Sequence, residues 1–356
     1  MRRNRPIKAA VELPPIAAGG GKVTVKDIAR AAGVSIATVS RVLNNPGLVT
    51  ADKQEAVLEA LRNHDYIPNQ HARSLISRRS RVIGLVVPTL SNPVFAPTIA
   101  AIEREFDRAG YGLLIQCSER DPQRELAQVR TLIERGVDGL IITGSRNGLD
   151  LPALMLRNQV PHVWQDTSLD QPMEPSVAHD NIGALESAID HLYAMGHREV
   201  AVFSGPTHNT PSIRDRVHGA ITRIRHHGLD LPETWRVITE DYESRTIRSG
   251  ACRLLDARRP PTAVALTGDV LALGLVAECR ARGLSVPNDL SIIGCGDTDM
   301  GQYVDPPLTT VHMPFAEMGE AAARSLLTVI SGQRPPMSVV LPHRLIIRQS
   351  VRAPRR

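Results

Sequence analysis

Residues 24–44, TVKDIARAAGVSIATVSRVLN, predict two short helices joined by a tight turn. Thr24 is a favourable N-cap, and the carboxylate of Asp27 can reach back to this cap and also favours the positive end of the helix. Gly33 predicts the end of the first helix, because glycine takes a left-handed conformation at little cost. Ser35 is expected to cap the second helix. Apolar residues mark a buried side of both helices at helical spacing: Val25, Ile28, Ala29, Ala32, Val39, Val42 and Leu43.

The rest of the second helix carries small, polar or cationic side chains, namely Ala37, Thr38, Ser40, Arg41 and Asn44, while Ile36 could face either way. Short side chains let a helix approach the major groove of DNA, and arginine can pair bidentately with guanine. An ordinary helical hairpin with a solvated polar face would show the same turn, because such turns are common. At this point the pattern leaves both interpretations open.

The residues that follow favour the first interpretation. A third helix is predicted over about 51–63 with Thr50 as its N-cap, and YIPN follows at 66–69. Together with VTVKDIARAAGVSIATVSRVLN and a basic linker that contains Leu75, this stretch resembles the lactose/galactose repressor (LacI/GalR) family of bacterial transcription regulators. The resemblance implies a flexible extension over 1–22, a helix-turn-helix DNA-binding domain over 23–68, and a hinge helix and linker over 69–80.

The resemblance also implies which residues contact DNA. Leu75 lies where the family's leucine wedges into the minor groove and kinks the duplex, although a linker leucine could instead pack on the core. The expected DNA contacts are Thr24, Val25, Ser35, Ile36, Ala37, Thr38, Ser40, Arg41, Asn44, Thr50, Tyr66, Asn69, His71, Ala72, Arg73 and Leu75.

The distribution of charge agrees with a DNA-binding N-terminal part. Residues 1–80 hold 13 Lys and Arg against 6 Asp and Glu, a net charge of +7, whereas the net charge of the remainder is −2.

From residue 81 short apolar runs alternate with amphipathic segments, which predicts parallel sheets covered on both faces. The expected strands span 81–87, 112–117, 138–143, 199–204, 263–267 and 290–295. The expected helices span 95–109, 123–135, 184–195, 215–227, 245–257 and 270–282. Two such series predict two lobes and resemble the sugar-binding-protein fold, in which the chain crosses between the lobes three times. We expect the crossings near 179–183, 305–310 and 330–336.

The predicted fold class is therefore an all-α helix-turn-helix DNA-binding head followed by an α/β, two-lobed, periplasmic-binding-protein-like core with parallel sheets. The effector-binding and dimerisation core is expected over 81–348, with a C-terminal tail over 349–356. The resemblance implies a homodimer whose heads engage the half-sites of a pseudo-palindromic, double-stranded operator. The sequence does not decide whether the ligand weakens or promotes DNA binding. It also leaves open whether the protein forms a dimer or a tetramer.

Ligands in such folds bind beyond the carboxyl ends of the strands, here between the lobes. That rule and the resemblance together give the expected effector contacts: Phe95, Arg120, Trp164, Asp166, Thr210, Arg216, Asp269 and Asp297. Arg216 is the strongest of these, because a guanidinium can clamp hydroxyls or a carboxylate with a bidentate fork. Phe95 could instead pack a helix start, and Arg120 could form a surface salt bridge.

Three positions depart from the family pattern. Gly268 replaces the usual Asn beside Asp269, Gly296 replaces the first Asp of the usual G-[FY]-D-D, and Met313 lies where a polar effector contact is common. Because these positions lack side-chain hydrogen-bond acceptors, a standard pyranose is less strongly indicated as the ligand. The run CGDTDMGQYVDPPLTT is similar to the gluconate-regulator-like branch, so a sugar acid held by Arg120 or Arg216 is a further hypothesis beside a neutral sugar.

Other classes find less support in the sequence. A solute-binding protein of the same core fold, without a transcriptional role, should carry an export signal and no DNA head. Residues 1–22 lack an apolar run of signal-peptide length, and no run of about 18 apolar residues predicts a membrane span. The four cysteines have no CxxC spacing, and GxSxG, GxxxxGK[ST] and HExxH are absent. We therefore expect a cytoplasmic protein that is not an enzyme, with no metal or cofactor.

Overall fold

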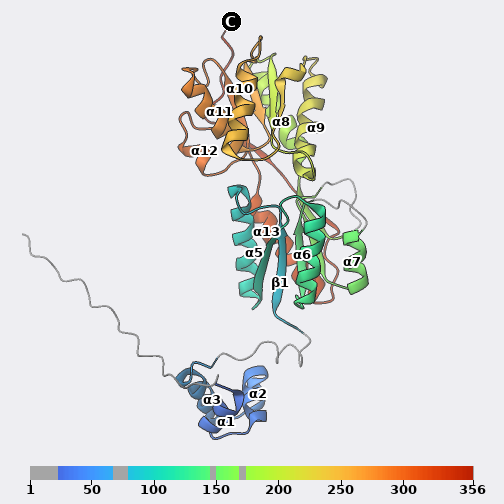
Figure 1. Ribbon diagram of the computed structural model, residues 1–356, viewed down its shortest axis with the longest axis vertical. Coiled ribbons are helices and arrows are strands. Elements are labelled where there is room, and N and C mark those ends of the chain that lie inside the picture. Colours follow the sequence, from blue (N-terminus) through green and yellow to red (C-terminus); the bar gives the residue numbers. More distant parts are fainter. Residues whose placement is uncertain (1–22, 67–78, 145–149, 168–173, 356) are drawn as a thin grey trace, which may run out of the picture. The chain divides into compact units, whose positions relative to one another are not determined.

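The computed structural model describes residues 23–66, 79–144, 150–167 and 174–355, apart from the side chains of Asn44 and Pro46. The chain divides into two compact units, residues 1–78 and 79–356. The first is a small helical head, and the second contains two α/β lobes (Figure 1). None of the helices in these ranges is long and apolar enough to cross a membrane.

The head consists of α1 (Val25–Ala31), α2 (Ile36–Asn44), the 3-10 turn η1 (Pro46–Leu48) and α3 (Ala51–Asn63). Side-chain caps fix the starts of α1 and α2, as the sequence predicts, whereas Thr50 precedes α3 but its side chain makes no cap hydrogen bond. The Thr24 backbone N–H donates to Asp27 Oδ2 at 3.0 Å, and Ser35 Oγ accepts from the Thr38 backbone N–H at 3.1 Å. Gly33 has a φ of +65°, a left-handed conformation that ends α1.

A small apolar core holds the three helices of the head together. Ile28, Val39 and Val57 are each 0% exposed, and Ala29, Val42 and Ala60 are buried around them. Ile36, which the sequence left undecided, is 44% exposed. The polar and small residues of α2 therefore share a surface with an apolar side chain.

Sheet A has six strands in the order β2-β1-β3-β4-β5-β11, and all of its pairs are parallel. The strands are β1 (Val82–Val87), β2 (Gly112–Cys117), β3 (Gly139–Thr143), β4 (His162–Gln165), β5 (Ser176–His179) and β11 (Ser338–Leu341). One face packs on α5 (Ala96–Arg108) and α13 (Phe315–Ile330), and a short 3-10 turn η2 (Pro93–Phe95) leads into α5. The other face packs on α6 (Pro122–Glu134) and α7 (Asp150–Asn158) (Figure 1).

Sheet B has six strands in the order β7-β6-β8-β9-β10-β12, of which β12 runs antiparallel to β10. The strands are β6 (Val200–Ser204), β7 (Arg236–Ile238), β8 (Ala263–Leu266), β9 (Ser291–Gly296), β10 (Thr309–His312) and β12 (Arg344–Ile346). Helices α8 (Asn181–Ala194) and α9 (Pro211–His226) cover one face, and α10 (Ser244–Leu255) and α11 (Asp269–Ala281) cover the other. The remaining short elements are η3 (Glu233–Trp235) and α12 (Met300–Tyr303).

The expected strands and helices of the core all occur, with ends shifted by a few residues. The first crossing, between β5 and α8 at residue 180, is confirmed. The second and third predictions are wrong, because the chain crosses at 313–314, between β10 and α13, and at 342–343, between β11 and β12. The strands that flank these crossings are short and carry hydroxyl or charged residues, so the sequence shows no strong apolar run there.

Candidate functional site

A pocket of about 870 Å³ of empty space, partly open to solvent, lies between the two lobes of the core. Its walls come from segments that follow β1, β2, β3 and β4 in one lobe and β6, β7, β8 and β9 in the other. This is the edge where the parallel strands of both sheets end, and ligands of such folds bind there. Six of the expected effector residues line it: Phe95, Arg120, Asp166, Thr210, Arg216 and Asp269.

Arg216 projects from α9 into this pocket and is only 4% exposed. Its Nε donates to Asn181 Oδ1 at 2.8 Å, and its Nη1 donates to the Thr267 carbonyl at 2.8 Å. Asn181 is the first residue of α8, immediately after the first crossing. Two neutral acceptors therefore orient the Arg216 guanidinium and connect it to that crossing.

Arg120 follows β2 with a left-handed φ of +60° and reaches the opposite lobe. Its guanidinium carbon lies 5.3 Å from the ring centroid of Tyr242, and its carbonyl accepts from Asn209 Nδ2 at 2.9 Å. Its Nε is buried and has no hydrogen-bond partner. Burial lowers the pKa of Arg120, although the nearby Tyr242 opposes this shift. Since no carboxylate in the described ranges pairs with it, the surface salt-bridge interpretation has no partner there.

Asp166 follows β4 in a left-handed conformation, with a φ of +52°. Its Oδ1 is buried without a hydrogen-bond partner and lies 3.8 Å from Nδ1 of His179. The His179 side chain is 0% exposed, and its ring meets that of Phe315 edge-on at 5.1 Å. His179, which ends β5, was not expected from the sequence, and only its place before the predicted crossing could have indicated it.

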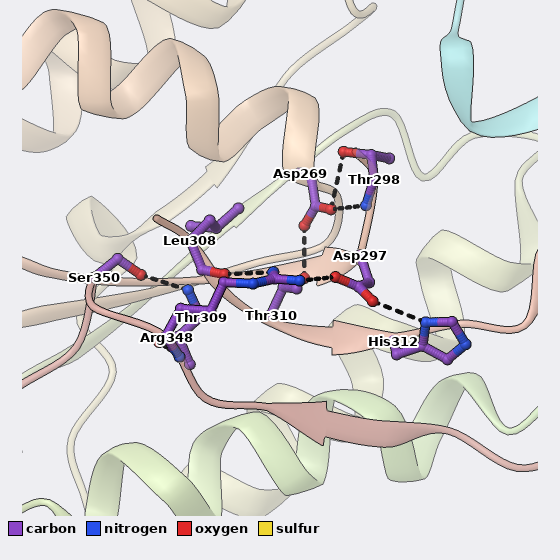
Figure 2. Close-up of polar contacts among 9 residues, drawn as sticks. All are labelled: Asp269, Asp297, Thr298, Leu308, Thr309, Thr310, His312, Arg348 and Ser350. Atoms are coloured by element: carbon purple, nitrogen blue, oxygen red, sulfur yellow. Dashed lines mark hydrogen bonds and ion pairs between the residues drawn. The ribbon is translucent and has the colours of Figure 1, made fainter. Parts of the chain in front are cut away.

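Asp269 begins α11 and is 2% exposed (Figure 2). Its Oδ2 accepts from the backbone N–H of Thr298 at 2.7 Å and from the Thr298 hydroxyl at 3.1 Å, while its Oδ1 accepts from the Thr310 hydroxyl at 2.7 Å. Burial raises the pKa of Asp269, and these hydrogen bonds offset part of that shift. Both carboxylate oxygens are thus occupied in holding α11 to β10 and to the loop after β9.

Asp297 does not line the pocket, which corrects its expected role as an effector contact. Figure 2 shows it between Arg348 and His312, with Oδ1 2.5 Å from Arg348 Nη2 and Oδ2 3.0 Å from His312 Nδ1. Burial would raise the pKa of Asp297, but the bonds from Arg348 and His312 outweigh it, so the net shift is downward. Asp297 fixes the start of the loop whose next residues, including Thr298, do line the pocket.

Trp164 is the second expected contact that lies away from the pocket. It is 0% exposed and packs in the core between sheet A and helices α6 and α7. Trp164 lies within β4 and faces the core, whereas Asp166 lies just past the strand end, where its left-handed backbone conformation breaks the alternation of the strand, and it lines the pocket. Tyr242 lines the pocket but was not expected, because it follows β7, which the sequence did not indicate.

Gly268, one of the two glycines that depart from the family pattern, leaves part of the pocket wall without a side chain. A Cβ added at Gly268 would have no atom within 4 Å. Gly296 has a φ of +139°, which L side chains rarely adopt, and a Cβ there would lie 3.3 Å from Asp269 Oδ2. Gly268 therefore offers open space, Gly296 does not, and neither position supplies a polar side chain. No group of three or more His, Cys, Asp or Glu within the described ranges is arranged to hold a metal ion.

On the head, the expected DNA contacts gather around α2 and the helix starts. Ile36, Ala37 and Arg41 are exposed, and Thr38 and Ser40 are half-buried. Ser35 and Thr24 take part in the helix caps, so their side chains are oriented before any partner binds. Val25, Thr50 and Tyr66 also belong to the head. The Asn44 side chain and Asn69, His71, Ala72, Arg73 and Leu75 lie outside the described residues.

Two family models match the chain. Residues 24–69 match bacterial regulatory proteins of the lacI family, and residues 189–351 match a periplasmic binding protein-like domain. The chain is 35% identical to the HTH-type transcriptional regulator DegA of Bacillus subtilis over 335 residues, 92% of this chain and 98% of DegA. It is 34% identical to the HTH-type transcriptional repressor CytR of Escherichia coli, over 93% of this chain and 96% of CytR. A solved lac repressor dimer bound to operator and the anti-inducer ONPF is similar in structure, with a TM-score of 0.85 and 29% identity, over 94% of this chain and all of that chain.

Proposed function

The chain belongs to the lacI family of bacterial regulatory proteins, and from this premise we propose that it binds a pseudo-palindromic operator as a homodimer and that a small molecule in the interlobe pocket controls its operator affinity. The observation that carries the proposal is the presence in one chain of an exposed, capped α2 and a pocket built by both lobes. The alternative, a solute-binding protein without a transcriptional role, gives no reason for the head.

In this proposal α2 enters the major groove. Arg41 is its exposed cation and would read guanine, while Ile36 and Ala37 would contact thymine methyl groups. The backbone N–H groups at the starts of α1, α2 and α3, near Thr24, Ser35 and Thr50, suit phosphate contacts, which position the helix without reading bases. Leu75 would wedge into the central minor-groove step and kink the duplex.

The pocket also supports control of the core by ligand. Arg120 of one lobe contacts Tyr242 and Asn209 of the other, and Arg216 bonds Asn181 beside the first crossing. A ligand among these residues would touch both lobes and a crossing segment, so it would favour one arrangement of the lobes over another. The resulting coupling to DNA affinity is expected to be about 1–3 kcal/mol. A sugar or sugar acid is the proposed ligand class.

The test compares an operator obtained by selection from random duplexes with an unselected duplex of equal length. Arg41→Ala should cost about 1–3 kcal/mol on the selected operator and little on the unselected duplex, because only the former uses base contacts. Arg62→Ala, an exposed arginine on α3, is the matched control. Leu75→Ala should likewise weaken selected binding far more than unselected binding. Equal losses on both duplexes would refute the proposed roles of Arg41 and Leu75.

A further inference from the structure

Two arginines of the interlobe pocket, the buried Arg216 and the half-buried Arg120, have no carboxylate partner among the described residues. Within the described ranges Arg216 donates to two neutral acceptors, Asn181 Oδ1 and the Thr267 carbonyl, and Arg120 faces the ring of Tyr242 with its Nε unsatisfied. Among the described residues, no Asp or Glu forms an ion pair with either arginine, whereas the well-shielded Arg348 pairs with Asp297. A buried cation is costly unless an anion compensates it, so the pocket favours a negatively charged group.

The two cations act on the same part of the pocket. Burial raises the pKa of Tyr242, Arg120 and Arg216 oppose that shift, and Asp166 adds a smaller contribution in the same direction as burial. Arg120, Arg216 and Tyr242 line the same pocket, and the Arg120 guanidinium carbon lies 5.3 Å from the centroid of the Tyr242 ring. A planar guanidinium matches a carboxylate through parallel hydrogen bonds, so one acid group could pair with this region in a defined orientation.

Few groups in the pocket are free to recognise the hydroxyls of a neutral sugar. Both oxygens of Asp269 are occupied, and the Thr298 hydroxyl bonds Asp269. The Thr267 hydroxyl already contacts Ser204 and the Gly205 backbone N–H. Asp166 does keep one buried oxygen without a hydrogen-bond partner, 3.8 Å from His179 Nδ1, and this oxygen can accept from one ligand donor. A ligand with many hydroxyls would leave some of them unpaired, which is unfavourable in a buried site.

The other walls are apolar and include flat rings. Phe95 and Phe315 line the pocket from one lobe, and Ile213, Leu273 and Met300 line it from the other. The side-chain-free wall at Gly268 leaves room beside them. Such surfaces favour a ring with an apolar face, because ring faces stack on aromatic side chains.

We infer that the effector is a small ring compound bearing one carboxylate, which pairs with Arg120 and Arg216 while the ring lies against Phe95 and Phe315. This inference rests on the proposed function of the pocket and names its ligand class. The ring can be a cyclic sugar acid or an aromatic acid, and the two share the acid group and the apolar ring face. Asp166 then accepts a hydrogen bond from a hydroxyl of the ring.

The experiment measures binding of matched acid and neutral probes to the full-length protein by calorimetry at constant ionic strength. The pairs are galacturonate with galactose, and 4-hydroxybenzoate with 4-hydroxybenzyl alcohol. In at least one pair the acid should bind about tenfold or more tightly than the neutral partner. Preference within the first pair identifies a sugar acid, and preference within the second identifies an aromatic acid. If neither acid is preferred, the inference is wrong.

Two variants sharpen the test. Arg120→Met should reduce the preference for the acid to about twofold or less, whereas Arg344→Met, an exposed arginine on β12, should retain it. A preference that survives in Arg120→Met overturns the inference. Operator affinity is measured separately with every probe that binds. A neutral probe that binds best and shifts operator affinity overturns the acid inference but supports the proposed function, while an acid that binds without any such shift supports the inference and contradicts the proposed function.

Discussion

Arg348→Met removes the cation that holds Asp297 while keeping a side chain of similar length. Arg348 donates to Asp297 Oδ1 at 2.5 Å and to the Leu308 carbonyl at 2.8 Å (Figure 2). The Asp297 and Arg348 side chains are 13% and 17% exposed, so water can replace the lost partner only in part. The variant therefore leaves a poorly solvated carboxylate, to which His312 still bonds from the part of the chain that the structure describes.

The expected loss follows from this shielding. Exposed ion pairs contribute at most about 1 kcal/mol, whereas removing one partner of a buried pair costs about 3–5 kcal/mol. Because the Asp297 and Arg348 side chains both have small exposed fractions, we expect a loss of about 3 kcal/mol in the free energy of unfolding at pH 7. For a unit of this size that corresponds to a fall in Tm of about 6–12 °C.

The loss should also depend on pH. The folded-state pKa of Asp297 is lowered, so the stability from this pair is present above the ordinary carboxyl pKa of 3.8 and is lost as the pH falls through the lower folded value. The difference between wild type and Arg348→Met should therefore shrink on acidification below about pH 4.

Tryptophan fluorescence is the suitable assay, because Trp164 and Trp235 are the only tryptophans and both belong to the 79–356 unit. Thermal unfolding is followed between pH 7 and pH 3 for wild type, Arg348→Met and the exposed control Arg344→Met. If Arg348→Met loses no more stability than Arg344→Met at pH 7, or if its loss is unchanged at pH 3, the argument from the Asp297 pair is refuted.

Three further predictions use the same fluorescence signal. Burial raises the pKa of Glu125 from 4.5 to about 7, so the free energy of unfolding of the wild type should fall by up to about 3 kcal/mol as the pH rises from 4.5 to 7. Glu125→Gln should abolish this pH dependence, and an unchanged dependence would contradict the assignment. Ile28→Ala should cost about 2–5 kcal/mol, comparable with the whole stability of so small a head, and should abolish operator binding while the tryptophan-monitored transition stays unchanged. Gly219→Ala would place a Cβ 2.3 Å from the Ile182 carbonyl oxygen and should lower the stability of the two-lobed unit by about 1–3 kcal/mol; an unaltered Tm would argue against this close packing of α8 and α9.

The head could be predicted from the sequence because its signals are local. Thr24 and Asp27, or Ser35 and Thr38, are three residues apart, and each pair fixes a helix start without reference to the rest of the chain. Glycine at position 33 similarly needs only its own backbone conformation. Such features can be recognised in the sequence, because the interacting residues lie within one helical turn of each other.

The pocket was predictable only in part. Arg216 and Asp269 were expected from their motifs, and both line it. Asp297 looked equivalent in sequence, but its partner Arg348 lies 51 residues further along the chain, and that pairing turns it away from a ligand role. Tyr242 was missed for another reason, because it follows β7, a three-residue strand that the sequence did not indicate. Long-range pairing, and not residue type, separates the side chains that face the ligand space from those that support it.

The order of the strands has a consequence for how the chain is made. Sheet A begins with β1, yet its edge strand β11 and its covering helix α13 are encoded only after β10 of sheet B. During synthesis, the lobe that starts first is therefore completed late, and its apolar face around Ile83 and Leu85 lacks Met318 and Leu326 until residues 315–341 have left the ribosome. A chain that stops before residue 315 would expose that face, and we expect it to aggregate or to be degraded and not to persist as a DNA-binding fragment with half a core.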